Sequence, residues 1–206
     1  PYQRFIAEQV AGDLLPASTP AQRSEQLIAT GLLTMASLDL SEGGELFRLD
    51  RVDDQIDVTT RAFMGLTMSC ARCHDHKTDP VTQRDYYALA GIFESTQLLT
   101  GAAGRGAGGK NAGNVAGMHS LSDSGQAMGV REGKATDSFV CLQGESRQAG
   151  PRVPRGFLAV ASPGKNPTIS RSQSGRLQLA EWMTAKDNPL TARVAAEPTG
   201  TIRSLE

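Results

Sequence analysis

The chain has few aromatic residues, few cysteines and almost no net charge. Phe, Trp and Tyr make up 5% of its 206 residues, whereas glycine occurs 22 times, so we expect extensive loops. Lys and Arg (21) balance Asp and Glu (22), which gives a formal net charge of −1 and no bulk attraction for nucleic acid or anionic membranes. No apolar run approaches the roughly 20 residues that a membrane-spanning helix needs.

Several patterns of common enzymes and binding sites are also missing. The Gly-Lys-Asn run at 109–111 lacks the Ser or Thr of a phosphate-binding loop. No Ser/His/Asp or paired-carboxylate arrangement is identifiable from spacing, so a hydrolase has no residues to support it. There is no second C-x-x-C pair, so a zinc site would have to recruit Cys141, His76 or His119.

The chain does contain one C-x-x-C-H motif, Cys70-Ala71-Arg72-Cys73-His74, which is the spacing of c-type haem attachment. Thiols three positions apart lie on one face of a helical turn and can reach both vinyl groups of one porphyrin. We therefore expect haem c as the cofactor, with Cys70 and Cys73 as attachment points and His74 as the proximal iron ligand. Zinc binding, or a redox-active or structural dithiol, are the alternatives.

Residues near the motif suggest further contacts with a haem. Arg72, Lys77 and Arg84 can neutralise the haem propionates, or they form part of a solvated charged surface. Tyr86 and Tyr87 fall in the next helix, and we expect one of them, Tyr86, to pack on the porphyrin. His76 is expected to be a hydrogen-bond partner within the motif region.

The second axial ligand must come from elsewhere, because His76 is too close in sequence to reach the opposite side of the porphyrin. His119 is the first candidate for this metal-binding position; a methionine and an open site are the alternatives. The methionines are Met35, Met64, Met68, Met118, Met128 and Met183.

Hydrophobic spacing predicts helices over residues 2–15, 20–35, 48–68 and 85–93, the last one capped near Thr82. Residues 38–47 are expected to form a loop. Short apolar runs predict strands at 128–130, 138–142 and 156–160, followed by a helix at 174–185 that ends before Pro189. Cys141 and Trp182 are expected in the core.

These elements predict an α+β fold with three parts. Residues 1–99 form a mainly α-helical haem c domain, residues 100–118 a flexible Gly-rich loop, and residues 119–206 a small β-containing segment with a C-terminal helix.

Residues 63–96 resemble the signature of large planctomycetal cytochrome c-like proteins that carry paired DUF1549 and DUF1553 domains. The shared run is L-T-x-x-C-A-R-C-H-D-H-K-x-D-P-x-x-x-x-D-Y-Y-x-L-x-G-I-F. Segments 1–9 and 55–59 are similar to the first of these domains, and segments 154–157, 174–177 and 188–193 to the start of the second. The chain departs from the family in a shorter 93–117 segment, in ending soon after residue 193 and in an unmatched tail, 195–206.

The resemblance implies an extracytoplasmic haem c module, either periplasmic or extracellular. Because c-type haem is attached outside the cytoplasm and the sequence starts at Pro1, we expect a secretion signal upstream of it or removed from it.

Motif and resemblance together predict electron transfer through one covalent haem. The expected partner is a redox protein or further copies of the chain. A homo-oligomer is possible in the second case. Two alternatives remain: an open-site haem enzyme acting on a small oxidant or a carbohydrate-derived substrate, and a zinc-binding adaptor. No catalytic residue is assigned.

Overall fold

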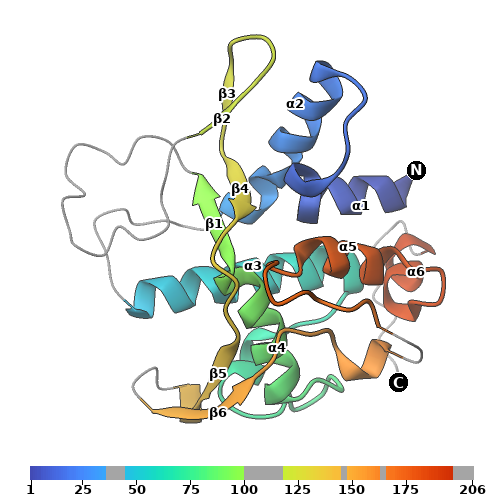
Figure 1. Cartoon of the computed structure of the whole chain (residues 1–206). Coiled ribbons are helices and arrows are strands. Elements are labelled where there is room, and N and C mark those ends of the chain that lie inside the picture. The colour runs from blue at the N-terminus through green and yellow to red at the C-terminus, as the bar shows by residue number, and fades with distance from the viewer. Residues whose placement is uncertain (36–44, 100–117, 145–147, 163–165, 197–206) are drawn as a thin grey trace.

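The computed structural model describes residues 1–35, 45–99, 118–144, 148–162 and 166–196 (Figure 1). Their α-helices are α1 (Tyr2–Ala11), α2 (Pro20–Ala29), α3 (Glu45–Met64), α4 (Gln83–Glu94), α5 (Arg176–Thr184) and α6 (Pro189–Ala196). The 3₁₀ helices are η1 (Gly12–Leu14), η2 (Thr30–Thr34), η3 (Ser69–Arg72), η4 (Leu142–Gly144) and η5 (Ala159–Ala161). None of the helices in these ranges is long and apolar enough to cross a membrane.

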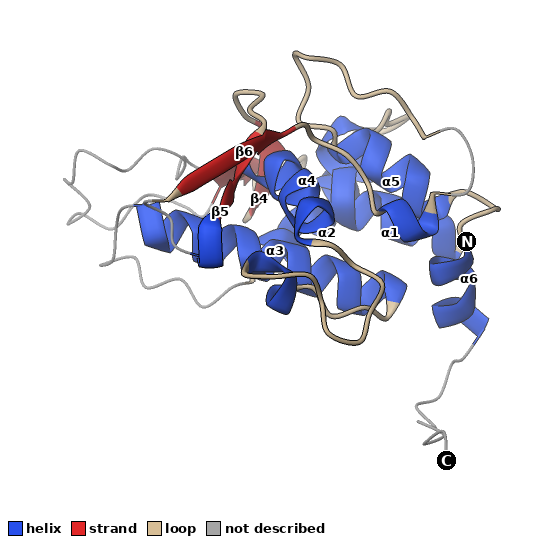
Figure 2. Cartoon of the chain, turned by 90° about the horizontal axis from the view of Figure 1, so that it is seen from below, coloured by secondary structure: helices blue, strands red, loops and turns tan. Residues whose placement is uncertain are grey.

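The strands form antiparallel pairs: β1 (Thr96–Leu99) with β4 (Gly129–Glu132), β2 (His119–Ser120) with β3 (Gln126–Ala127), and β5 (Ser138–Cys141) with β6 (Ala149–Val153). Helices dominate, and β5 and β6 lie beside α4 (Figure 2). The expected α+β fold is confirmed.

Capping residues explain where two of the predicted helices begin. Thr19 Oγ1 accepts a hydrogen bond from the Gln22 backbone N–H at 3.1 Å, and Pro20 occupies the first turn of α2. Thr82 and Asp85 form a reciprocal capping box at the start of α4, as expected for Thr82.

Helix α3 differs from its prediction at both ends. Residues 45–47, predicted as loop, are helical, and residues 36–44 lie outside the described residues. The helix ends at Met64 and not at Met68, because Gly65 adopts a left-handed conformation with a φ of +64°.

The strand predicted at 156–160 is wrong. Its Gly156 N–H donates to the Ala88 carbonyl at 3.2 Å, and its Ala159 N–H donates to Asp85 Oδ1 at 2.9 Å. The segment therefore bonds to α4 instead of pairing with a strand. The partner of β5 is β6, which a sequence pattern misses because residues 150–151 are Gly and Pro.

A helix also follows the predicted stop at Pro189. Asn188 Oδ1 accepts from the Leu190 N–H at 3.1 Å, so Asn188 caps α6 and Pro189 occupies its first turn.

One hydrophobic core joins the two ends of the chain. Helix α5 packs against α1, α6 packs against α3, and β1 pairs with β4 (Figure 1). The fully buried Arg176 of α5 forms a bidentate ion pair with Asp13, with N–O distances of 2.6 and 2.8 Å. Buried residues from 1–99 and from 130–183 belong to one cluster, and residues 100–117 lie outside the described residues. The three-part division stays a prediction.

Candidate functional site

The first three residues of the C-x-x-C-H motif lie in the 3₁₀ turn η3, which packs against α3 and α4, and Cys73 follows the turn directly. Ala71 is fully buried and its N–H donates to the Met68 carbonyl at 2.8 Å. Cys70 and Cys73 flank it, both exposed and neither in a disulfide. Burying the alanine thus anchors the turn while both thiols remain at the surface.

His74 is exposed and is fixed by one hydrogen bond. Its Nδ1 lies 2.8 Å from the Asp75 backbone carbonyl. A carbonyl only accepts hydrogen bonds, so Nδ1 carries the proton and Nε2 keeps its lone pair. Histidine ligands in metal sites commonly use this arrangement, which orients the ring and leaves one nitrogen for the metal.

His76 is held quite differently, with 7% of its side chain exposed. Its Nδ1 accepts from the backbone N–H groups of Asp79 (2.8 Å) and Thr78 (3.3 Å). Nε2 must therefore be the protonated nitrogen that donates to Thr67 Oγ1 at 3.2 Å. Thr67 Oγ1 in turn donates to Asp79 Oδ2 at 2.9 Å. His76 thus closes the loop after the motif through hydrogen bonds; that it supports an iron ligand stays a prediction.

Arg72, Tyr86 and Lys77, the residues predicted to contact a haem, differ in their burial and in their hydrogen bonds. Arg72 donates to Asp50 Oδ1 at 2.7 Å; burial lowers the pKa of Arg72, but the bond to Asp50 and the nearby charges of Tyr86, Asp50 and Asp53 together raise it. Tyr86 is 2% exposed and donates to Asp53 Oδ1 at 2.7 Å; burial first, then the Asp53 charge, raise the pKa of Tyr86. Lys77 is exposed. Of these three side chains, only that of Lys77 is exposed, as are the two thiols and His74.

Helix α4 fixes the backbone of the motif at its C-terminal side. The Arg72 carbonyl accepts from Tyr87 Oη at 2.9 Å and from Gln83 Nε2 at 3.1 Å. Asp75 Oδ1 accepts from the Gln83 N–H at 2.8 Å. These bonds hold the peptide that leads into Cys73.

Gly144 of η4 is a part of the site that sequence reasoning missed. A Cβ atom built on it would overlap with Cys73 Sγ. The Gln143-Gly144 pair directly after a predicted strand is a turn signal, but nothing in the sequence indicates that the turn meets the motif. Cys141, just before this turn, is buried as predicted.

His119 is not brought to the motif. Its Nε2 lies 3.0 Å from the Val130 carbonyl, to which it donates, and its ring packs against Gly129. The β2–β3 hairpin that carries it lies at one end of the molecule, whereas α4 and the β5–β6 hairpin lie toward the other (Figure 1). His119 as second axial ligand stays a prediction that requires the hairpin to move.

Within the described ranges, no group of three or more His, Cys, Asp or Glu side chains is arranged to hold a metal ion. Cys70, Cys73 and His74 thus do not converge on one point. A zinc site would need such convergence from four ligands.

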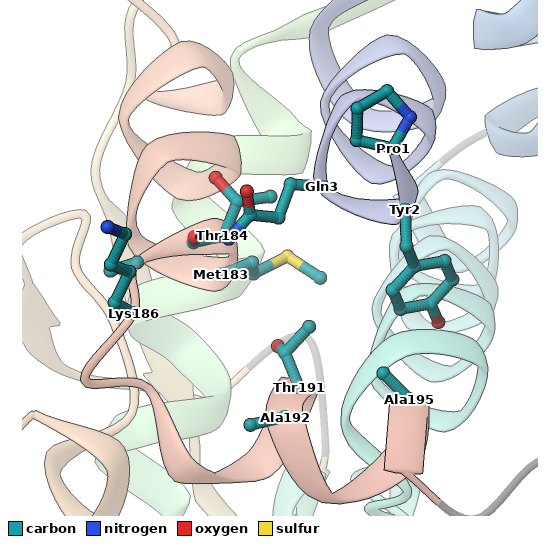
Figure 3. A pocket seen from close by; sticks show the side chains of 10 residues that line it. Pro1, Tyr2, Gln3, Met183, Thr184, Lys186, Thr191, Ala192 and Ala195 are labelled. Atoms are coloured by element: carbon teal, nitrogen blue, oxygen red, sulfur yellow. Dashed lines mark hydrogen bonds between the residues drawn. The ribbon is translucent and has the colours of Figure 1, made fainter.

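An open pocket of about 410 Å³ lies apart from the motif (Figure 3). It lies between the start of α1, the end of α5 and α6, where Gln3 Nε2 donates to the Thr184 carbonyl at 3.3 Å. Its lining includes no cysteine and no histidine. The pocket therefore adds no group to the motif.

The site thus defines an α+β protein with an exposed C-x-x-C-H turn. Residues 1–98 of the 206 match the family model PSCyt2, described as a protein of unknown function (DUF1549). This match covers α1 to α4 and the motif. No curated protein and no solved structure matches the chain.

Proposed function

We propose that the protein is a c-type cytochrome, in which Cys70, Cys73 and His74 hold one haem and the protein transfers electrons. The observation that carries this proposal is the state of the three side chains. Both thiols are exposed and free, and the hydrogen bond of His74 Nδ1 leaves Nε2 as an available ligand atom. A haem bound here would supply one-electron redox chemistry between ferrous and ferric iron.

The chain's own residues account for selective attachment. Each thiol adds across one vinyl group: sulfur bonds to one vinyl carbon, the thiol hydrogen goes to the other, and no oxidant is consumed. Cys70 and Cys73 are exposed, whereas Cys141 is 8% exposed and its backbone carbonyl lies 3.5 Å from Tyr87 Oη. Burial thus leaves the two motif cysteines as the thiols that a porphyrin can reach.

The family resemblance supports the same proposal. The signature over residues 63–96 is similar to that of planctomycetal cytochrome c-like proteins, and the DUF1549 match covers the motif. From this resemblance we propose a periplasmic or extracellular location. The electron partner is a redox protein or further copies of the chain.

The donor set favours haem over zinc. A haem c needs two separated thiols and one histidine from the motif, whereas structural zinc needs four ligands around one point. In the described part of the chain, no cluster of three or more His, Cys, Asp or Glu side chains forms around the motif. Lys77, exposed beside the motif, is one of the basic residues that we propose for a haem propionate.

The test is a pyridine haemochrome assay with a reduced-minus-oxidised visible spectrum, on protein produced with the c-type haem maturation machinery. We expect one haem per chain with two thioether bonds, and no covalent haem in a Cys70→Ser/Cys73→Ser control. A six-coordinate native spectrum supports an electron carrier. A high-spin iron that binds cyanide readily would favour an open-site enzyme, and a colourless protein with stoichiometric zinc would refute the proposal.

A further inference from the structure

The turn between β5 and β6 touches the motif, although it lies outside the residues that match the family model. Gln143 and Gly144 both have positive φ angles, of 54° and 75°. This backbone path places Gly144 directly against Cys73. A Cβ atom on Gly144 would overlap with Cys73 Sγ and would lie 3.7 Å from Cys73 Cβ. Residue 144 must therefore lack a side chain for the sulfur to keep its position.

The helix that holds the motif also holds this hairpin. Ser138 Oγ of β5 donates to Glu94 Oε1 of α4 at 3.1 Å. Gly91 of α4 allows close packing, since a Cβ there would lie 3.2 Å from the Ser138 nitrogen. Near the motif, Tyr87 Oη donates to the Arg72 carbonyl and lies 3.5 Å from the Cys141 carbonyl. Helix α4 therefore fixes the turn and the motif relative to each other.

We propose that Gly144 is a positioning residue for the Cys73 thiol, so that the β5–β6 hairpin forms part of the haem-attachment site. This inference rests on the proposed function, because it concerns the second thioether bond. Addition of the Cys73 S–H across a vinyl group requires the sulfur to face the reacting carbon. A side chain at residue 144 would occupy the space of Sγ and force Cys73 into another rotamer.

The first test is Gly144→Ala, produced with the maturation machinery. We expect the fraction of chains with both thioethers to fall about two- to tenfold, the range that an off-rotamer side chain costs, while the Cys70 thioether remains. Mass spectrometry of haem peptides and the shifted haemochrome band of a free vinyl group measure this. The matched control is Gly175→Ala, which also has a positive φ, of 98°, but meets Ile169 and no cysteine. It should keep both thioethers.

A second test needs no haem. In haem-free protein, Gly144→Ala should lower the denaturant midpoint of unfolding, partly by backbone strain and partly by the clash with sulfur. In a Cys73→Ala background the sulfur is gone, so the same substitution should lower the midpoint less. Equal decreases in both backgrounds would overturn the contact.

The outcomes separate this inference from the proposed function. Wild-type protein without covalent haem would overturn both. Wild-type protein with two thioethers, together with an unaffected Gly144→Ala variant, would overturn the role of Gly144 alone.

Discussion

The two histidines of the signature, His74 and His76, lie two residues apart and have opposite roles. His74 is exposed, makes one bond to a backbone carbonyl and leaves Nε2 available. His76 is almost buried, and both of its nitrogens are engaged by the loop it closes. Sequence proximity therefore says little about which imidazole can bind a metal; the hydrogen bonds decide it.

The same contrast extends over the whole signature. Cys70, Cys73 and His74 present their side chains to solvent, whereas Ala71 is buried and Arg72 is half-buried. Residues 75–87 supply the framework: Asp75 and Asp85 cap α4, and Tyr86 and Tyr87 bond to α3 and to the motif backbone. The first half carries the chemistry that we propose, and the second half holds it in place.

Removing both motif thiols should give the largest effect. In Cys70→Ala/Cys73→Ala we expect complete loss of covalent haem, whereas the free energy of unfolding of haem-free protein should change by less than about 0.5 kcal/mol, since both side chains are exposed. Haem staining of denaturing gels and urea unfolding measure the two quantities. The control Cys141→Ala should retain haem and lose about 1 kcal/mol of stability, because its thiol is buried. Haem that remains covalent in the double variant would contradict the assignment.

Replacing His76 should mainly lower stability, unlike removal of the two thiols. His76→Ala removes two accepted backbone hydrogen bonds and one donated bond, so we expect a loss of about 2 kcal/mol in the free energy of unfolding. His74→Ala, the matched control, should cost less than about 0.5 kcal/mol, as its ring is exposed. Urea unfolding of haem-free protein compares the two. Equal losses would show that the two histidines do not differ as described.

Phenylalanine substitutions at the two tyrosines of α4 should have smaller effects on stability, and they separate stability from haem attachment. Tyr86→Phe removes the bond to Asp53 and should cost about 1 kcal/mol without changing haem content. Tyr87→Phe removes a comparable bond, but to the Arg72 carbonyl that leads into Cys73. We expect only Tyr87→Phe to reduce the yield of covalent haem, measured by haemochrome absorbance per chain. A reduced yield in Tyr86→Phe alone would show that the Tyr86 hydroxyl, and not that of Tyr87, supports haem attachment.

The smallest effect is expected at Lys77. Because its side chain is exposed, Lys77→Ala should change the free energy of unfolding by less than about 0.5 kcal/mol. If its ammonium group neutralises a propionate, removing that charge should favour ferric iron and lower the reduction potential. Potentiometric titration at low ionic strength and at 0.15 M salt measures this, since salt screens the effect of an exposed charge. An unchanged potential at low salt would make Lys77 an ordinary solvated residue.

Prediction from sequence worked best for elements that local patterns specify. Hydrophobic spacing located α1 to α5, and Thr82 with Asp85 marked the start of α4. It failed where distant contacts decide the outcome. Residues 156–160 look like a strand, but their backbone bonds to Ala88 and Asp85 of α4. Strand β6 was not predicted because Gly150 and Pro151 interrupt its apolar alternation. It forms because β5 lies beside it and pairs with it.

The sequence by itself determined the C-x-x-C-H motif, the helices around it and the α+β class, because spacing and capping act over a few residues. Only the tertiary structure decided which side chains of the motif remain available. Packing against α3 and α4 buries Tyr86, the loop at Asp79 engages His76, and the β5–β6 turn places Gly144 against Cys73. The physical reason is that burial and hydrogen-bond partners come from segments that are far apart along the chain and meet only in the folded protein.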